Sequence, residues 1–319
     1  MNIKGILAVL LALVLVSCNY SIKNTDKKHV TFATLKGPSS MGMIKMIDSL
    51  ANAESNELKV EILNEPIQVR KLVIDGTADF AVLPTTMAAI MYNKGLDYKL
   101  VAIPVWGTLY LFGSDTTIRS WSDLKGKKVN VMAKGMTPDV LFRYLLEKNG
   151  ISPGKDITLD YSFPTHIDLA NAVAAGQATL GVISEPLVSL VMQRNKEVYP
   201  IFDLNREWGN ALNIPIAQTA LIVKKSLIEK NPQLVEQVVS CYRSSSQWVN
   251  CYPDSAAELI VKYGILPNVE VAQCAIPRSN MKFVRARSEI ERIGEYLAIF
   301  YQMNPEIIGG KVPDENFYY

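Results

Sequence analysis

The sequence predicts an α/β protein made of two Rossmann-like lobes with mixed, mostly parallel sheets, joined by a hinge that the chain crosses twice. Three observations lead to this fold class. Short β-rich runs alternate with helix-periodic segments up to about residue 112, and a second series of the same kind begins near residue 121. Beyond residue 223 almost only helices are predicted. Strands that alternate with helices favour a mainly parallel sheet covered on both faces.

The first series begins with an alternating strand, His29 to Leu35, followed by the Gly-rich turn Lys36 to Ser40 and the apolar-periodic segment Met41 to Ile47. This pattern is typical of a strand, a turn and a helix. Further strands are predicted at residues 58–63, 79–83, 100–105 and 108–112, and helices at 67–74 and after Pro84-Thr85-Thr86.

The second series contains strands at residues 129–132, 157–161 and 178–183 and helices at 138–148 and 166–175. A strand at 218–223 then precedes the helical segment that ends the chain. Two α/β units followed by a helical return predict that the last third of the chain completes the first lobe. Paired crossings of this kind act as a hinge when a ligand binds between the lobes.

The first residues are typical of an export signal. Lys4 precedes an uncharged apolar run, Gly5 to Val16, which is too short to span a bilayer. The run ends in Leu15-Val16-Ser17-Cys18, which resembles a bacterial lipobox. The sequence therefore predicts a lipoprotein signal peptide at 1–17, diacylglycerol on Cys18, and a polar tether at 18–28. The alternative is an ordinary signal peptide with an incidental cysteine.

Composition argues against several classes of function. The net charge of +2, with both signs dispersed, gives no support for nucleic-acid binding. No paired Cys-x-x-Cys motif is present, so no metal site is expected. Cys241, Cys251 and Cys274 leave two alternatives open, one disulfide with a free thiol or three buried core residues.

Several short motifs occur in an order and spacing that resembles a known family. They are the opening strand with Gly37-Pro38-Ser39-Ser40, residues 76–82 (Gly-Thr-Ala-Asp-Phe-Ala-Val), residues 122–129 (Ser-Asp-Leu-Lys-Gly-Lys-Lys-Val), Ala175-Gly176-Gln177-Ala178, Glu185-Pro186 and residues 308–313 (Ile-Gly-Gly-Lys-Val-Pro). The sequence resembles the periplasmic-binding-protein type II proteins. Within them it is similar to the nitrate/sulfonate/taurine/pyrimidine-precursor (NMT1/THI5-like) substrate-binding components of ABC importers.

This resemblance implies lobe I at 29–115 plus 216–319, lobe II at 116–215, and a ligand in the cleft between them. It also implies a monomer with no cofactor, held at the outer face of a bacterial membrane. Its partners would be a small molecule, an ABC permease and the ATPase of that permease.

Ligands of such sheets bind outside the carboxyl ends of the strands, so the strand-to-helix turns are the candidate site. Hydroxyls and free amides at helix starts suit an anion or another strong acceptor. The candidate residues on these turns are Lys36, Gly37, Pro38, Ser39, Ser40, Met41, Thr85, Thr86, Met136, Thr137 and Pro138. The alternative for Ser39 or Ser40 is that it only caps its own helix.

Trp106, Gly107 and Phe163 lie near predicted strand ends, where aromatic side chains and Met41 or Met136 would wall a pocket for a planar ligand. Core packing is the alternative for each of them. On the pocket hypothesis, Trp106→Ala and Thr137→Ala should weaken binding and leave the melting temperature little changed.

Glu185 follows a predicted strand, so we expect its carboxylate at the cleft rim or in the cleft, accepting from a ligand amine or amidine. The alternative is a helix-start glutamate favoured by the macrodipole. If Glu185 binds the ligand, a simple oxyanion such as nitrate is disfavoured as that ligand. If Lys36 and Lys134 both face into the cleft, an oxyanion is favoured.

Two other classes of function remain open. The first is an enzyme similar to the thiamine-pyrimidine synthases, which share this fold but carry a cysteine-rich motif and an essential histidine. Here the histidines are His29 and His166, and no cysteine cluster accompanies them. The second is a ligand-sensing lipoprotein without a transport role. The sequence favours a binding protein without catalytic residues.

Overall fold

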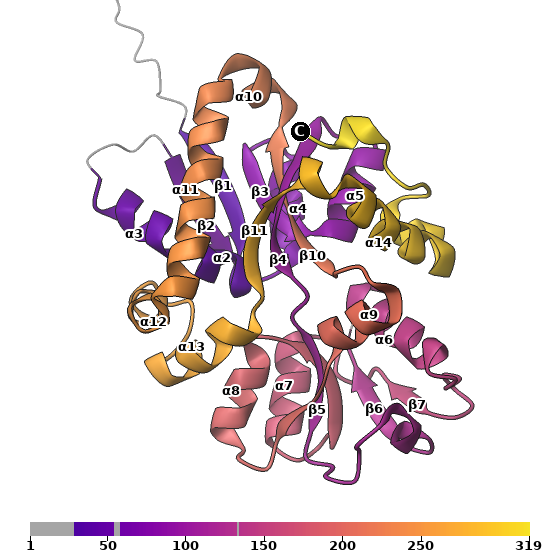
Figure 1. The fold of residues 1–319 in the computed structure, drawn as a ribbon. Coiled ribbons are helices and arrows are strands. Elements are labelled where there is room, and N and C mark those ends of the chain that lie inside the picture. The colour runs from indigo at the N-terminus through magenta and orange to yellow at the C-terminus, as the bar shows by residue number, and fades with distance from the viewer. Residues whose placement is uncertain (1–28, 54–57, 133) are drawn as a thin grey trace, which may run out of the picture.

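The structure, a computed structural model, describes residues 29–53, 58–132 and 134–319. Its two β-sheets form the centres of two lobes, and Figure 1 shows the lobes one above the other with the chain passing between them. The predicted signal peptide, Cys18 and the tether lie outside the described residues. No helix among the described residues is long and apolar enough to cross a membrane.

Lobe I is built on a six-stranded sheet of order β11-β4-β10-β3-β1-β2. Its strands are β1 (Val30–Leu35), β2 (Leu58–Leu63), β3 (Phe80–Pro84), β4 (Tyr98–Trp106), β10 (Ala217–Lys224) and β11 (Met281–Arg285). β1 pairs in parallel with β2 and β3, while β10 runs antiparallel between β3 and β4. β11 pairs antiparallel with the other edge of β4.

Lobe II is built on a five-stranded sheet of order β7-β6-β8-β5-β9. Its strands are β5 (Leu109–Gly113), β6 (Lys128–Val131), β7 (Thr158–Asp160), β8 (Leu180–Ser184) and β9 (Tyr199–Asp203). β6 pairs in parallel with β7 and β8, and β5 runs antiparallel between β8 and β9.

Helices cover both faces of each sheet. Those of lobe I are α2 (Pro38–Gly42), α3 (Ile44–Ala51), α4 (Pro66–Ile74), α5 (Thr85–Asn93), α10 (Lys225–Lys230), α11 (Pro232–Cys251), α12 (Pro253–Lys262), α13 (Val269–Ala275) and α14 (Ile290–Met303). Those of lobe II are α6 (Thr137–Lys148), α7 (His166–Ala174), α8 (Leu187–Arg194) and α9 (Leu204–Leu212). Short 3₁₀ turns lie at Trp121–Leu124, Ile276–Arg278 (η2), Ala286–Glu289, Pro305–Ile308 and Glu315–Phe317.

Strand alternation determines which helices pack on which face of the lobe I sheet. Phe32, Val82 and Leu221 face α11 and α3 and pack there with Tyr242, whereas Ala81 and its neighbours face α4, α5 and α14. Figure 1 shows α11 and α14 on opposite sides of this sheet. Helices therefore cover both faces of the sheet, and it is the carboxyl ends of its parallel strands that face lobe II.

The two mixed sheets confirm the predicted fold class, but they are less parallel than expected. The strands that carry the chain between the lobes, β5 and β10, are antiparallel to both of their neighbours. β5 was expected in lobe I, but it lies in the lobe II sheet, so the first crossing is at Gly107 and Thr108 rather than at 115. The expectation of almost only helices after residue 223 was also incomplete, because β11 forms the lobe I edge.

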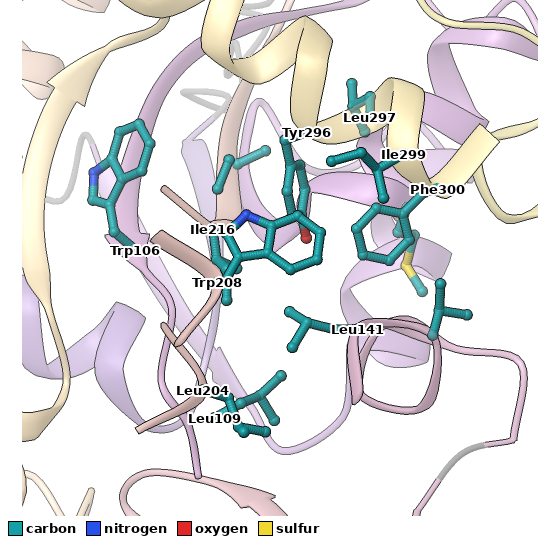
Figure 2. Close-up of a cluster of buried hydrophobic side chains, with 14 of the residues drawn as sticks. Trp106, Leu109, Leu141, Leu204, Trp208, Ile216, Tyr296, Leu297, Ile299 and Phe300 are labelled. Carbon is teal, nitrogen blue, oxygen red and sulfur yellow. The ribbon is translucent and has the colours of Figure 1, made fainter. Parts of the chain in front are cut away.

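The two lobes also share an apolar contact beside the crossings, drawn in Figure 2. Trp208 of α9 lies between Tyr144 of α6 and two rings of α14. Its ring centroid is 5.3 Å from that of Tyr144, 6.0 Å from Tyr296 and 6.5 Å from Phe300. Trp208 and Tyr296 are fully buried. This contact ties lobe II to the C-terminal helix of lobe I.

Candidate functional site

The candidate site, here called the interlobe site, consists of four turns that follow strand ends in the two lobes. Residues 36–41 and 84–86 follow β1 and β3 of lobe I, and residues 134–138 and 185–189 follow β6 and β8 of lobe II. This is the edge of each sheet at which ligands of open α/β proteins bind.

Helix starts from the two lobes touch at the centre of the interlobe site. Thr86, in the first turn of α5, and Thr137, the first residue of α6, have Oγ1 atoms 3.0 Å apart. Both residues are buried, with 6% and 8% of their surface exposed. Amides of a first helical turn lack intrahelical acceptors, so this place combines two hydroxyls with donors from both lobes.

The turn after β1 also contacts lobe II. Gly37 has φ of 120°, a conformation that favours glycine, and a Cβ built on it would lie 3.4 Å from Cδ of Pro186. Ser40 Oγ accepts from Gly37 N and donates to Gly37 O, both at 3.1 Å, so its hydroxyl closes its own turn. The backbone oxygen of Ser39 accepts from Tyr242 OH of α11 at 2.9 Å. These bonds fix the shape of the turn and fasten it to α11 within lobe I.

Three threonine hydroxyls at this end of lobe I are buried without a hydrogen-bond partner. They belong to Thr34 near the end of β1, Thr85 at the start of α5, and Thr219, whose Cα pairs with Pro84. Asn130 Nδ2 of β6 in lobe II is likewise unpartnered. A buried polar group without a partner is costly, so these atoms are positions at which a ligand would gain hydrogen bonds.

The prediction from sequence missed Thr34, Thr219 and Asn130. A signal was present, since each is a polar residue with buried apolar neighbours in its strand. Thr34 and Thr219 share the face of Phe32 and Leu221 by strand alternation.

A buried carboxylate orders the lobe II turn. Asp139 accepts from Gly135 N at 2.7 Å, from Tyr161 OH at 2.7 Å and from Arg143 Nε at 3.0 Å. Burial, then the bond to Asp139, raises the pKa of Tyr161 to about 12, so the phenol keeps its proton. Lys134 Nζ lies 5.4 Å from the centroid of the Tyr161 ring. The network fixes the backbone that presents Thr137.

The remaining candidates of these turns lie in different environments. Met41 is fully buried in the lobe I core, and Pro138 is buried at the start of α6. Met136 is 52% exposed, Lys36 and Lys134 are exposed, and Phe163 packs at the edge of the lobe II core. Neither lysine is enclosed in the site, so the condition that favoured a simple oxyanion is not met.

Glu185 is buried rather than at a rim. Its side chain has no exposed surface and accepts from Ser189 N at 3.1 Å and from Ser189 Oγ at 2.9 Å. Burial raises its pKa to about 7, although the bonds from Ser189 and the charge of Arg278 act in the opposite direction. In this arrangement Glu185 accepts hydrogen bonds from the first turn of its own helix.

Trp106 packs into the first crossing. Its Nε1 donates to the backbone oxygen of Lys282 in β11 at 2.7 Å, and its own backbone N donates to Asn280 O at 3.1 Å. The residue is 7% exposed and belongs to the same hydrophobic cluster as Trp208, as Figure 2 shows. Because the indole connects β4 to β11, we now expect Trp106→Ala to lower stability, in contrast to the expectation from sequence.

Replacing Trp106 with phenylalanine should lower the free energy of unfolding by about 1–2 kcal/mol, because Lys282 O loses its buried donor. Denaturant unfolding of the two proteins measures the change. Trp248→Phe is the matched control, since Trp248 is only partly buried and lies on α11 away from the crossing. Equal losses in both variants would contradict a structural role for the indole N–H.

The sequence profile of a family described as NMT1/THI5 like matches residues 54–256, which is more than half of the chain. The chain belongs to the NMT1/THI5-like family. The predicted family resemblance is thereby confirmed.

Curated proteins and solved structures are also similar to this chain. The Bacillus subtilis binding protein YtlA is 27% identical over 143 residues, 45% of this chain and 41% of YtlA. The matched segment therefore spans less than half of that relative's length. The structure of an ABC transporter from Parabacteroides distasonis has 25% sequence identity to this chain and a TM-score of 0.79. The match covers 92% of this chain and 99% of the Parabacteroides chain.

Two more distant structures share the fold of this NMT1/THI5-like protein. The periplasmic aliphatic sulphonate-binding protein SsuA of Escherichia coli has a TM-score of 0.70 at 18% identity, over 92% of this chain and 94% of SsuA. The periplasmic nitrate-binding protein NrtA of Synechocystis has a TM-score of 0.57 at 15% identity, over 88% of this chain and 81% of NrtA.

The cysteines of this NMT1/THI5-like chain differ from both expectations. Cys241, Cys251 and Cys274 are exposed and unpaired, so they form neither a disulfide nor part of the core. They lie on helical surfaces, α11 and α13, where the apolar faces are filled by other residues. The described residues contain no group of three or more His, Cys, Asp or Glu side chains placed to hold a metal ion.

His166 begins α7, and burial lowers its pKa to about 4. Its imidazole is therefore neutral at neutral pH, and its Nδ1 has no hydrogen-bond partner.

Proposed function

We propose that this protein is a solute-binding lipoprotein that captures a small molecule between its two lobes and delivers it to an ABC importer. The observation that carries the proposal is the contact of Thr86 with Thr137. A molecule that replaces this contact would bond to helix starts of both lobes at once. Its affinity for the closed arrangement would then exceed that for the open one, which is the condition for ligand-driven closure.

The unpartnered hydroxyls of Thr34, Thr85 and Thr219 support a polar ligand that both donates and accepts hydrogen bonds. The candidate residues Gly37, Thr86 and Thr137 would surround it. Pyrimidine precursors, sulfonates, amines and oxyanions are the classes to compare, and the likeness to sulphonate-binding SsuA and nitrate-binding NrtA supports including sulfonates and nitrate.

Delivery and anchoring complete the proposal. The likeness to an ABC transporter component supports a permease and its ATPase as partners. Diacylglycerol on Cys18 would hold the protein at the outer face of a bacterial membrane, because two acyl chains suffice for stable anchoring. The protein would act there as a monomer.

A thermal-shift screen of the four ligand classes tests the proposal. A ligand at a hundredfold excess over its Kd stabilises the native state by about 2.7 kcal/mol, which is a readily measured rise in melting temperature. Failure of all four classes to shift the melting temperature would contradict the binding-protein proposal. Consumption of pyridoxal phosphate by the protein, the assay for the thiamine-pyrimidine-synthase alternative, would also contradict it.

Thr86→Val and Thr137→Val should each weaken the ligand found in the screen by about tenfold, because each removes one hydrogen bond at nearly constant shape. Titration calorimetry measures both Kd values. Thr158→Val, at an exposed position in β7, is the matched control and should leave Kd unchanged. Wild-type affinity in both site variants would place the ligand elsewhere.

A further inference from the structure

A second polar contact joins the lobes on the side of α8. Gln193 of α8 and Asn268, which precedes α13, exchange side-chain hydrogen bonds of 3.2 and 3.1 Å. Gln193 belongs to lobe II and Asn268 to lobe I. Both residues are partly buried, so the pair is covered as long as the lobes stay together.

The same interface buries a charged cluster. Arg278 of η2 in lobe I places Nη1 3.9 Å from Glu185 Oε1 and donates to Ser189 Oγ at 3.4 Å, and both of these partners belong to lobe II. Tyr110 OH of β5 donates to the backbone oxygen of Arg278 at 3.2 Å. The Glu185 side chain has no exposed surface, whereas 30% of the Arg278 side chain remains exposed.

Arg278 of η2 is the charged side chain that lowers the pKa of Glu185. Tyr110 of β5 is the neighbouring titratable group, and Asp203 of β9 and Glu185 both raise its pKa. Burial keeps the pKa of Tyr110 well above its ordinary value, so Tyr110 is neutral. On the turn that packs against Pro186, Lys36 is exposed.

Separation of the lobes would change the surroundings of Glu185. Ser189 stays with it, since both residues belong to lobe II, but Arg278 leaves and water reaches the carboxyl group. Burial is the largest cause of the raised pKa, which stands at about 7 against an ordinary 4.5. Opening therefore moves the pKa back toward the ordinary value, and closure takes up a proton.

We propose that Glu185, Ser189 and Arg278 form a proton-sensitive latch that couples closure of the two lobes to protonation of Glu185. The latch rests on the proposed function, because it regulates the closure that ligand capture would use. The closed state binds the proton more tightly than the open state. The extra stability that protonation gives the closed state is therefore fully present below pH 4.5 and is lost as the pH rises through about 7.

Amide hydrogen exchange of the full-length protein without ligand tests the latch. Peptides covering residues 185–193 and 268–280 report its opening, after correction for the intrinsic pH dependence of exchange. Between pH 8 and pH 5.5 protection should rise on the order of tenfold. Peptides of β2 and α4, which pack within lobe I, serve as the internal control and should change far less.

Glu185→Gln keeps a neutral, hydrogen-bonding side chain and imitates the protonated acid. It should show the acid-like protection at both pH values. Arg278→Lys keeps the positive charge and should keep the pH dependence, which guards against the case in which Glu185→Gln fails to fold. Equal wild-type protection at pH 5.5 and pH 8, or an unchanged pH dependence in Glu185→Gln, would overturn the latch.

The two proposals can fail separately. A ligand that binds with no pH-dependent protection would refute the latch and leave the binding function standing. Protection that depends on pH, with no ligand in the screen, would support the latch and count against the proposed function.

Discussion

Trp208→Ala should lower the free energy of unfolding by about 3–5 kcal/mol, because it removes a large, fully buried side chain and leaves a cavity. The loss would fall on both lobes, since the Trp208 ring packs on Tyr144 of lobe II and on Tyr296 and Phe300 of lobe I. Urea unfolding followed by circular dichroism measures the change in midpoint and slope.

Tyr301→Ala is the matched control for this variant. Tyr301 lies on α14 like Tyr296, but it is 39% exposed and is not part of the contact, so its loss should cost about 0.5 kcal/mol or less. A cost below about 1 kcal/mol for Trp208→Ala would mean that the lobes do not depend on each other for stability.

Gly107→Ala should cost about 2–4 kcal/mol from two separate effects. The residue has φ of +52°, where a Cβ adds about 1 kcal/mol of strain. That Cβ would also lie 2.2 Å from Oδ1 and 2.5 Å from Cγ of Asn205 in α9, and such overpacking adds about 1–3 kcal/mol. Because Gly107 lies in the first crossing, the variant should also change how the lobes sit against each other.

Gly126→Ala separates these two effects. Gly126 has φ of +77°, but nothing lies within 4 Å of the place that a Cβ would take, so this variant carries the backbone strain alone. The difference between the two unfolding free energies therefore measures the clash with Asn205. If both variants lowered the free energy of unfolding by the same amount, Asn205 would move away from the new Cβ at no energetic cost.

The fold was predictable from sequence where the signal is local. The strand and the helical segment that follows it in residues 30–51 were predictable from alternation and turn chemistry, although the structure divides the helical segment into α2 and α3. The position of β10 between β3 and β4 does not, because it joins residues more than 100 positions apart. For the same reason β5 was assigned to the wrong lobe, since its own five residues suit a buried strand in either sheet.

The candidate site was predicted in outline but not in its chemistry. The turns carrying Thr86 and Thr137 were found because strand-to-helix turns are recognisable in sequence, and the structure brings these two residues together. Arg278 was not found, since it lies 93 positions from Glu185 and only the fold makes them neighbours. The bond from Trp106 to β11 was not predicted, because a tryptophan at a strand end looks the same in sequence whether its indole faces a ligand or a neighbouring strand.

The central place of β10 in the lobe I sheet has a consequence for the order of assembly. β1, β2 and β3 cannot join β4 until residues 217–224 exist, and by then the whole of lobe II has been synthesised. A growing chain that has reached residue 215 can therefore hold a finished second lobe beside a first sheet still divided into two parts. Lobe II, which begins later in the sequence, can therefore complete its sheet before lobe I does.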